Sequence, residues 1–149
     1  MTKLHEIRQH GVSVWLDDLS RNRIQSDDLA NLRDQGVLGV TTNPAIFKAA
    51  ITAGADGIYG ADLNRLKADG ASAEMIVREL TVADVQAACD VFSATYAETG
   101  NDGCVSIEVD PRLAFDGNNT LKQAIELHKQ VNRPNVMIKI PATKNQSQQ

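Results

Sequence analysis

One lysine, Lys139, lies between Ile138 and Ile140 in the apolar run NVMIKI. Burial disfavours the charged form of a lysine side chain and lowers its pKa, so an interior lysine presents a free amine to a carbonyl group at neutral pH. The product of that attack is a Schiff base, an electron sink that permits cleavage of a nearby carbon–carbon bond. Lys139 therefore predicts imine chemistry.

Three other polar residues could assist such an amine: Asp17, Asn43 and Glu108. One carboxylate could take the proton from a departing hydroxyl group, and a second could carry the proton transfers that form the imine. An amide could hold substrate hydroxyl groups in register. These residue types cover the tasks that a Schiff-base lysine leaves to its neighbours.

Each of these residues also has a structural explanation. Asn43 precedes a proline and would make a good helix N-cap. Asp17 could begin the loop DDLSRN, and either acid of the run EVD could pair with the arginine that follows it. Lys139 could mark an edge strand, where a lysine discourages aggregation. Both explanations stay open for each residue at this point.

The elements that carry these residues are four short runs rich in β-branched side chains. They are separated by segments whose apolar residues recur at helical spacing, which indicates parallel strands joined by helices. The runs are VSVWLDD (12–18), VLGVTTN (37–43), CVSIEVD (104–110) and NVMIKI (135–140).

Alternate positions in each run differ in character, and successive side chains of a strand point to opposite faces. One set of alternate positions is aliphatic, and the other carries Asp17, Asn43, Glu108 and Lys139. A doubly wound sheet would show near-continuous apolar strands, whereas a barrel interior can become polar at its C-terminal mouth. The pattern predicts an α/β fold, the first four strands and helices of an incomplete (β/α)8 TIM barrel, with these four residues inside.

The intervening segments predict several helices. Ser26 would cap a helix ending at Gly36, and Pro44 would open the next one. Two short helices would follow over 60–70 and 72–80, and a separate one would open at Thr81 and end at Gly100. In the last helix, over 119–131, the predicted buried side is Leu121, Ala124, Ile125 and His128.

Composition excludes several classes of protein. The 149 residues carry 15 basic and 19 acidic side chains, with no basic stripe, which argues against a nucleic-acid partner. No run is apolar enough for a membrane span or a signal peptide, so we expect a cytoplasmic protein. The two cysteines lack C-x-x-C spacing and the three histidines share no ligand spacing, so we expect reduced structural thiols and no metal site.

The motifs SVWLDDLSR, GVTTNPAIF, VSIEVDPRLA and PNVMIKIPATK resemble those of the transaldolases, specifically the branch found in actinobacteria and cyanobacteria. The resemblance runs from about residue 11 through Lys144. It implies a cofactor-free enzyme of the pentose phosphate pathway. Such an enzyme moves a dihydroxyacetone unit from sedoheptulose 7-phosphate to glyceraldehyde 3-phosphate, giving erythrose 4-phosphate and fructose 6-phosphate.

The same resemblance implies a role for each matching residue. Lys139 would form the Schiff base, and Asp17 would be the acid/base at the C4 hydroxyl group. Glu108 would relay protons through a water molecule, and Asn43 would orient the three-carbon unit. Two further residues would line the same pocket, Thr41 and Thr42.

Members of this family continue into a second half of the barrel that grips the substrate phosphate, whereas this chain reads NQSQQ after Lys144. A complete barrel takes about 250 residues. We therefore expect residues 1–149 to form the N-terminal half of a barrel, with 145–149 as a divergent polar tail from a truncation or frameshift. Open strand edges would favour self-association, and transaldolase activity of the 149 residues alone would be weak or absent.

Two alternatives to transaldolase remain. A related aldolase would use the same residues and release the three-carbon unit to water. A non-catalytic barrel fragment would act only through interactions with other chains. The flanking motifs favour transaldolase over the aldolase, and the polar tail favours the fragment.

Overall fold

The computed structural model describes residues 2–143, in which strands alternate with helices. Its strands are β1 (Trp15–Leu16), β2 (Gly39–Val40), β3 (Cys104–Glu108) and β4 (Val136–Lys139). Its helices are α1 (Lys3–Gln9), α2 (Arg21–Gln25), α3 (Asp28–Asp34), α4 (Pro44–Ala53), α5 (Gly60–Ala68), α6 (Ala73–Thr99) and α7 (Gly117–Val131), with a 3-10 turn η1 (Pro111–Leu113).

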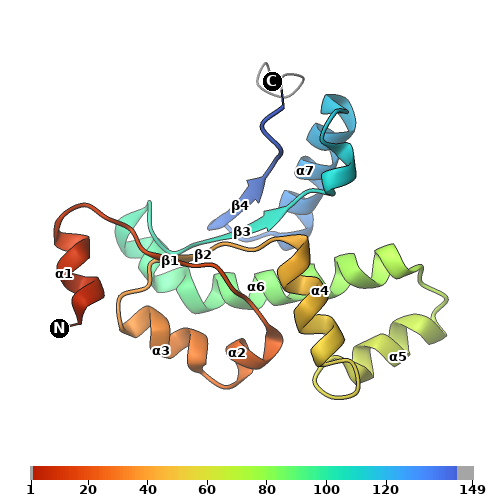
Figure 1. The fold of residues 1–149 in the computed structure, drawn as a ribbon, viewed down its shortest axis with the longest axis horizontal. Coiled ribbons are helices and arrows are strands. Elements are labelled where there is room, and N and C mark those ends of the chain that lie inside the picture. The colour runs from red at the N-terminus through yellow and green to blue at the C-terminus, as the bar shows by residue number, and fades with distance from the viewer. Residues whose placement is uncertain (1, 144–149) are drawn as a thin grey trace.

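The strands form one parallel sheet in the order β1-β2-β3-β4, so each strand lies beside the next one in the chain. Figure 1 shows α6 running along the sheet and α7 beside β4. Consecutive parallel strands joined by helices are the architecture of a partial (β/α) barrel. The predicted fold class is therefore confirmed.

The helices cover the aliphatic face of the sheet, as the alternation in the strands predicted. Val40 of β2 and Val105 of β3 are fully buried. They share one core with Phe92 of α6 and with Leu127 and Val131 of α7. The hydrophobic effect therefore fastens the helices to one side of the sheet and leaves the other side for polar groups.

The opposite face is less covered. The ring of Trp15 lies against Gly39 on the neighbouring strand, where an added Cβ would come within 2.6 Å of the ring. Met137 of β4 is 49% exposed. The face that a closed barrel would enclose is thus partly open in residues 2–143.

Two predicted helices are one. Thr81 does not open a helix but lies inside α6, where its hydroxyl group donates to the carbonyl oxygen of Arg78 at 3.1 Å. The N-cap is Ser72, whose side chain accepts from the backbone N–H of Met75. The helix ends at Gly100, as predicted, and Gly100 has the left-handed conformation. A threonine that satisfies its hydroxyl group on the preceding turn does not interrupt a helix.

The predicted N-cap at Ser26 is also wrong. Ser26 ends the short helix α2, and α3 begins after Asp27, which has a positive φ of 61°. The sequence between β1 and β2 therefore folds as two short helices with a tight turn between them.

The buried side of α7 differs from the predicted one by about a quarter of a turn. Thr120, Leu127 and Val131 are buried, whereas Leu121 and Ile125 are about half exposed. The helix carries two neighbouring apolar stripes, and the sheet and α6 cover only one of them.

A buried polar network fastens the chain after β1 to α5 and α6. Arg21 donates to Asp84 at 2.8 Å and to Asp62 at 2.7 Å, and its guanidinium group stacks over the ring of Tyr59. The Tyr59 hydroxyl group donates to Asp84 at 2.6 Å. Burial raises the pKa of Asp84, opposed by hydrogen bonds from Tyr59 and Arg21. This network holds the segment that begins at the end of β1.

Candidate active site

The four predicted polar residues lie toward one end of the sheet because all four strands are parallel. Asp17 follows β1, Asn43 follows β2 by a few residues, Glu108 ends β3 and Lys139 ends β4. Glu108 and Lys139 are direct partners in the ladder between β3 and β4. In (β/α) barrels, active sites lie at this C-terminal end of the strands.

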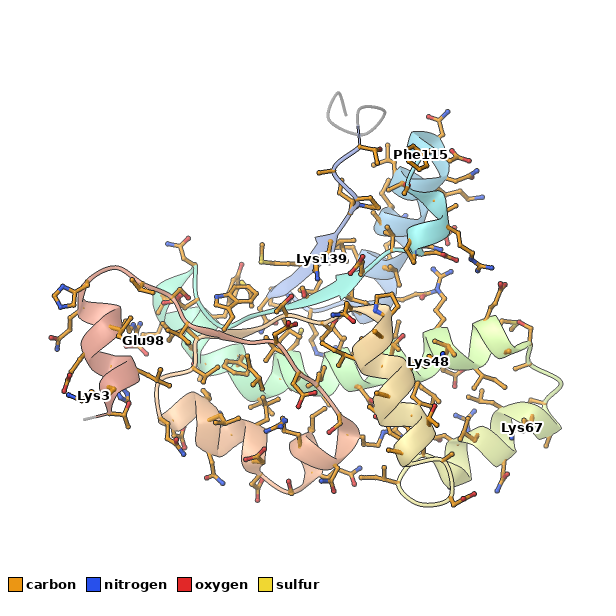
Figure 2. The ribbon with its side chains drawn as sticks, viewed as in Figure 1. Lys3, Lys48, Lys67, Glu98, Phe115 and Lys139 are labelled. Atoms are coloured by element: carbon orange, nitrogen blue, oxygen red, sulfur yellow. The ribbon has the colours of Figure 1, made fainter. Side chains whose placement is uncertain are left out.

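The amine of Lys139 contacts oxygen atoms from two other strands or their ends. Its Nζ lies 3.4 Å from Oε2 of Glu108, and it donates to the carbonyl oxygen of Thr42 at 2.8 Å and to the hydroxyl group of Thr41 at 3.4 Å. Because adjacent strands lie about 4.8 Å apart, the side chain crosses β3 to reach the end of β2. Figure 2 shows Lys139 at the sheet, well separated from the peripheral lysines Lys3 and Lys67.

The burial expected for Lys139 from the sequence is not found. Its side chain is 40% exposed, and that of Glu108 is 22% exposed. Within residues 2–143, no covering element lies over this side of β4, which is an edge of the described sheet.

The two threonines after β2 have different environments. Thr41 is half-buried and offers its hydroxyl group to Lys139. Thr42 is fully buried, and its hydroxyl group donates to the carbonyl oxygen of Ser106 at 2.7 Å. Only the main-chain oxygen of Thr42 therefore reaches the amine. Sequence reasoning gave Ser106 no role, although a hydroxyl group within an aliphatic strand was a visible signal.

The side chain of Asn43 uses its oxygen to cap a helix, while its nitrogen stays available for a substrate. Its Oδ1 accepts from the backbone N–H of Ile46 at 3.0 Å, which caps α4, and Pro44 occupies the first helical position. Its amide nitrogen makes no hydrogen bond to another described residue. The side chain can therefore cap the helix and donate to a substrate hydroxyl group at the same time.

Asp17 is exposed and forms no hydrogen bond or ion pair with another residue of the described range. Its neighbour Asp18 pairs with Arg23 at 2.8 Å, which makes Asp18 the acid that organises the loop. The carbonyl oxygen of Leu16 accepts from the N–H of Thr41 at 2.8 Å, so the chain at Asp17 runs beside Thr41. In a flat sheet β1 and β4 would be about 14 Å apart. Within residues 2–143, no hydrogen bond or ion pair joins Asp17 to Lys139 or Glu108.

The acid that pairs with Arg112 is Asp110. Its carboxylate accepts from the Arg112 guanidinium group at 2.8 and 3.0 Å, and this hydrogen bonding lowers the pKa of Asp110. The open choice between the two acids of the run EVD is thereby resolved, and Glu108 is left facing Lys139.

A groove of about 740 Å³ opens beside β3, between the sheet and the helices that cover its aliphatic face. Its walls include Phe47 of α4, Leu127 of α7 and the outward-facing Ile107, and it reaches Asn43 and Glu108 at its rim. The groove therefore belongs to the helix layer and borders the candidate site from outside.

Residues 2–143 contain no cluster of three or more His, Cys, Asp or Glu side chains that could hold a metal ion. None of the helices in this range is long and apolar enough to cross a membrane. Cys89 and Cys104 are buried and unpaired with each other, and burial raises the pKa of the Cys89 thiol to about 12.

Comparison with known proteins places the site in context. A family model described as "Transaldolase/Fructose-6-phosphate aldolase" matches residues 14–148. Among curated relatives, a transaldolase of Mycolicibacterium smegmatis is 55% identical over 135 residues, which is 89% of this chain. Transaldolase 1 of Streptomyces coelicolor is 54% identical over 95% of this chain, and a transaldolase of Saccharopolyspora erythraea is 51% identical over 95%. The chain spans only 36–38% of the length of these relatives.

Proposed function

This chain belongs to the transaldolase/fructose-6-phosphate aldolase family, and from that membership we propose that its chemistry is transaldolase chemistry through a Schiff base on Lys139. The observation that carries the proposal is the amine of Lys139 beside the carboxylate of Glu108 and the hydroxyl group of Thr41, on the inner face of the strands. No group other than side chains is needed for this reaction, so the proposal includes no cofactor.

In the proposed reaction, the free amine of Lys139 adds to the C2 carbonyl carbon of sedoheptulose 7-phosphate, and loss of water gives an iminium ion. Glu108, 3.4 Å from the amine, suits the proton transfers that expel this water. Asp17 then takes the proton of the C4 hydroxyl group and the C3–C4 bond breaks. Erythrose 4-phosphate leaves, and the bonding electron pair passes to the iminium nitrogen to give an enamine.

The enamine carbon then attacks the aldehyde carbon of glyceraldehyde 3-phosphate, and hydrolysis of the new imine releases fructose 6-phosphate and restores the amine. Asn43 has an unused amide nitrogen to hold the three-carbon unit, and Thr41 lines the same space. Thr42 contributes its main-chain oxygen beside the amine. These transfers define a step of the pentose phosphate pathway, and we place that step in the cytoplasm.

We further propose that the 149 residues act weakly or not at all when alone, as one N-terminal unit of the barrel with a polar end over 145–149, which lies outside the described residues. The inner face is partly open, and the Lys139 side chain is 40% exposed, so bulk water reaches the atoms that a closed barrel would shield. Open edges at β1 and β4 would favour association of two copies of the chain.

Borohydride trapping tests the lysine directly. We expect incubation with fructose 6-phosphate and borohydride, followed by peptide mass analysis, to place a reduced three-carbon or sugar adduct on the Lys139 peptide. Lys139→Arg should abolish this adduct, and Glu108→Gln should slow its formation about 100-fold or more. An adduct distributed equally over surface lysines such as Lys67 contradicts the proposal.

An aldolase is the second candidate, because the family description names fructose-6-phosphate aldolase beside transaldolase. Such an enzyme would release dihydroxyacetone when no acceptor aldehyde is present. A transaldolase would retain the three-carbon unit on Lys139 until glyceraldehyde 3-phosphate is added. If neither adduct nor product forms, the chain is a non-catalytic fragment. This third candidate is motivated by the chain spanning only 36–38% of the length of its relatives.

A further inference from the structure

Two hydroxyl groups replace the sheet ladder at the point where β2 leaves β3. The ladder between these strands ends at the pair Val40 and Val105. Two residues farther along, the backbone N–H of Thr42 donates to the hydroxyl oxygen of Ser106 at 3.0 Å, and the hydroxyl group of Thr42 donates to the carbonyl oxygen of Ser106 at 2.7 Å. Thr42 therefore donates both hydrogen bonds of the pair, and Ser106 accepts both.

Both members of this pair are buried. Thr42 has no exposed surface and Ser106 is 3% exposed. Hydrogen bonds shielded from water are difficult to exchange for solvent, and a buried N–H left without an acceptor is costly. The pair therefore fixes the backbone at Thr42 more firmly than a hydrogen bond at the surface would.

The pair also faces Lys139. The main-chain oxygen of Thr42 accepts from the Lys139 amine at 2.8 Å, the shortest of the three contacts of that amine. Ser106 also donates to the hydroxyl group of Thr41 at 3.3 Å, and this hydroxyl group is a second acceptor for the amine. Two of the three oxygen atoms around the amine are thus held through Ser106.

We infer that Ser106 is a positioning residue for Lys139, acting through Thr41 and Thr42 without contacting the amine itself. Its hydroxyl group keeps the two acceptors that follow β2 aimed across β3, so that the long lysine side chain has one preferred position beside Glu108. The catalytic importance of this position rests on the proposed function. The position of the amine itself does not, because it can be measured without any sugar.

The test is competitive labelling of the full chain with a small amine-reactive reagent at one fixed pH. The modification rate of Lys139 is expressed relative to that of Lys67, an exposed lysine on α5. We expect Ser106→Ala to raise this ratio about two- to tenfold, because the amine loses ordered acceptors. Ser106→Thr retains the hydroxyl group and should keep the ratio within about twofold of the unsubstituted chain.

Thr42→Val provides a second route, since it removes the other hydroxyl group of the pair at nearly constant volume and should raise the ratio in the same direction. If Ser106→Ala does not fold by circular dichroism, Thr42→Val decides. An unchanged ratio in a folded Ser106→Ala or Thr42→Val chain overturns the inference, as does an equal rise in Ser106→Thr. Failure of borohydride trapping with a normal labelling response would instead reject the proposed function and leave the positioning role standing.

Discussion

Single residues on the inner face have more than one task each. Asn43 caps α4 through its oxygen and keeps its nitrogen free, and Thr42 uses its hydroxyl group for Ser106 and its carbonyl oxygen for Lys139. The structural and chemical explanations that the sequence left open are therefore compatible. In the pair Asp17 and Asp18, the structural role and the proposed chemical role fall on different residues. Asp18 organises the loop through its ion pair with Arg23, and Asp17 is left for chemistry.

Gly39 is a position where side-chain size should decide stability. A Cβ there would lie 2.6 Å from the Trp15 ring and 2.9 Å from the carbonyl oxygen of Cys104, and this backbone atom cannot move without disturbing the ladder. We expect Gly39→Ala to lower the free energy of unfolding by about 1–3 kcal/mol in urea titration. Trp15 is the single tryptophan, so its fluorescence should shift as well.

Gly57→Ala is the matched control for this substitution, because the nearest atom to an added Cβ at Gly57 is 3.9 Å away and its φ is not positive. It should change the unfolding free energy by no more than about 0.5 kcal/mol. Equal effects of the two substitutions would show that contact with Trp15 and β3 is not the cause.

At the scale of elements, α6 is the part of the fold that local sequence describes least well. A serine or threonine before an apolar run looks the same whether it caps a helix or continues one. Thr81 continues the helix because α6 is already capped by Ser72, and the Thr81 hydroxyl group bonds to Arg78 within it. The number and order of the strands were predictable because their alternation has a period of two and one face is buried. Their lengths were not, since β1 and β2 cover only two residues each of the predicted runs 12–18 and 37–43.

Two substitutions test where α6 begins. Ser72→Ala removes the N-cap acceptor and should lower the unfolding free energy by about 0.5–1 kcal/mol. Thr81→Val keeps the shape and removes a hydroxyl group bonded within the helix, so its effect should stay below about 0.5 kcal/mol. If Thr81→Val proved the more damaging in chemical denaturation, α6 would consist of two helices.

The ion pair between α5 and α2 should make stability depend on pH. Hydrogen bonding to Arg21 lowers the pKa of Asp62 below its ordinary value of 3.8. A carboxyl group whose pKa falls on folding contributes stability above its unfolded pKa and loses it as the pH falls through its folded pKa. Asp62→Asn should therefore be less stable than the unsubstituted chain at neutral pH, by no more than about 1 kcal/mol since Asp62 is partly exposed.

That difference should narrow below about pH 4 and vanish in stronger acid, as followed by urea titration at several pH values. Asp84 shares Arg21 with Asp62, and the charge of Asp62 is one of the causes, after burial, that raise the pKa of Asp84, so the comparison reports both carboxylates around Arg21. Asp56→Asn, at an exposed residue without an ion pair in the described range, is the control and should track the unsubstituted chain at every pH. A constant difference for Asp62→Asn down to strong acid would exclude linkage to this carboxylate.

At the scale of the whole molecule, the arrangement of α7 depends on what else covers it. Its two apolar stripes are equally visible in the sequence, and the sheet and α6 bury one of them. The choice could not be predicted from residues 119–131 alone, since it is set by the neighbours of the helix. The same is true of Lys139, whose exposure is determined by the edge position of β4.

The uncovered stripe and the open edge at β4 lead to a prediction about association. Leu121 and Ile125 on α7 and Met137 on β4 are each about half exposed. Apolar side chains beside an unpaired strand edge are typical of surfaces that associate.

We expect sedimentation velocity to show a concentration-dependent increase in mass, and the double substitution Leu121→Glu with Ile125→Lys to reduce it. Met75→Lys, at an even more exposed apolar residue on α6, should leave association unchanged. A chain that stays monomeric at every concentration, or a Met75→Lys chain that dissociates as readily as the double variant, would mean that the exposed stripe of α7 does not pair two copies.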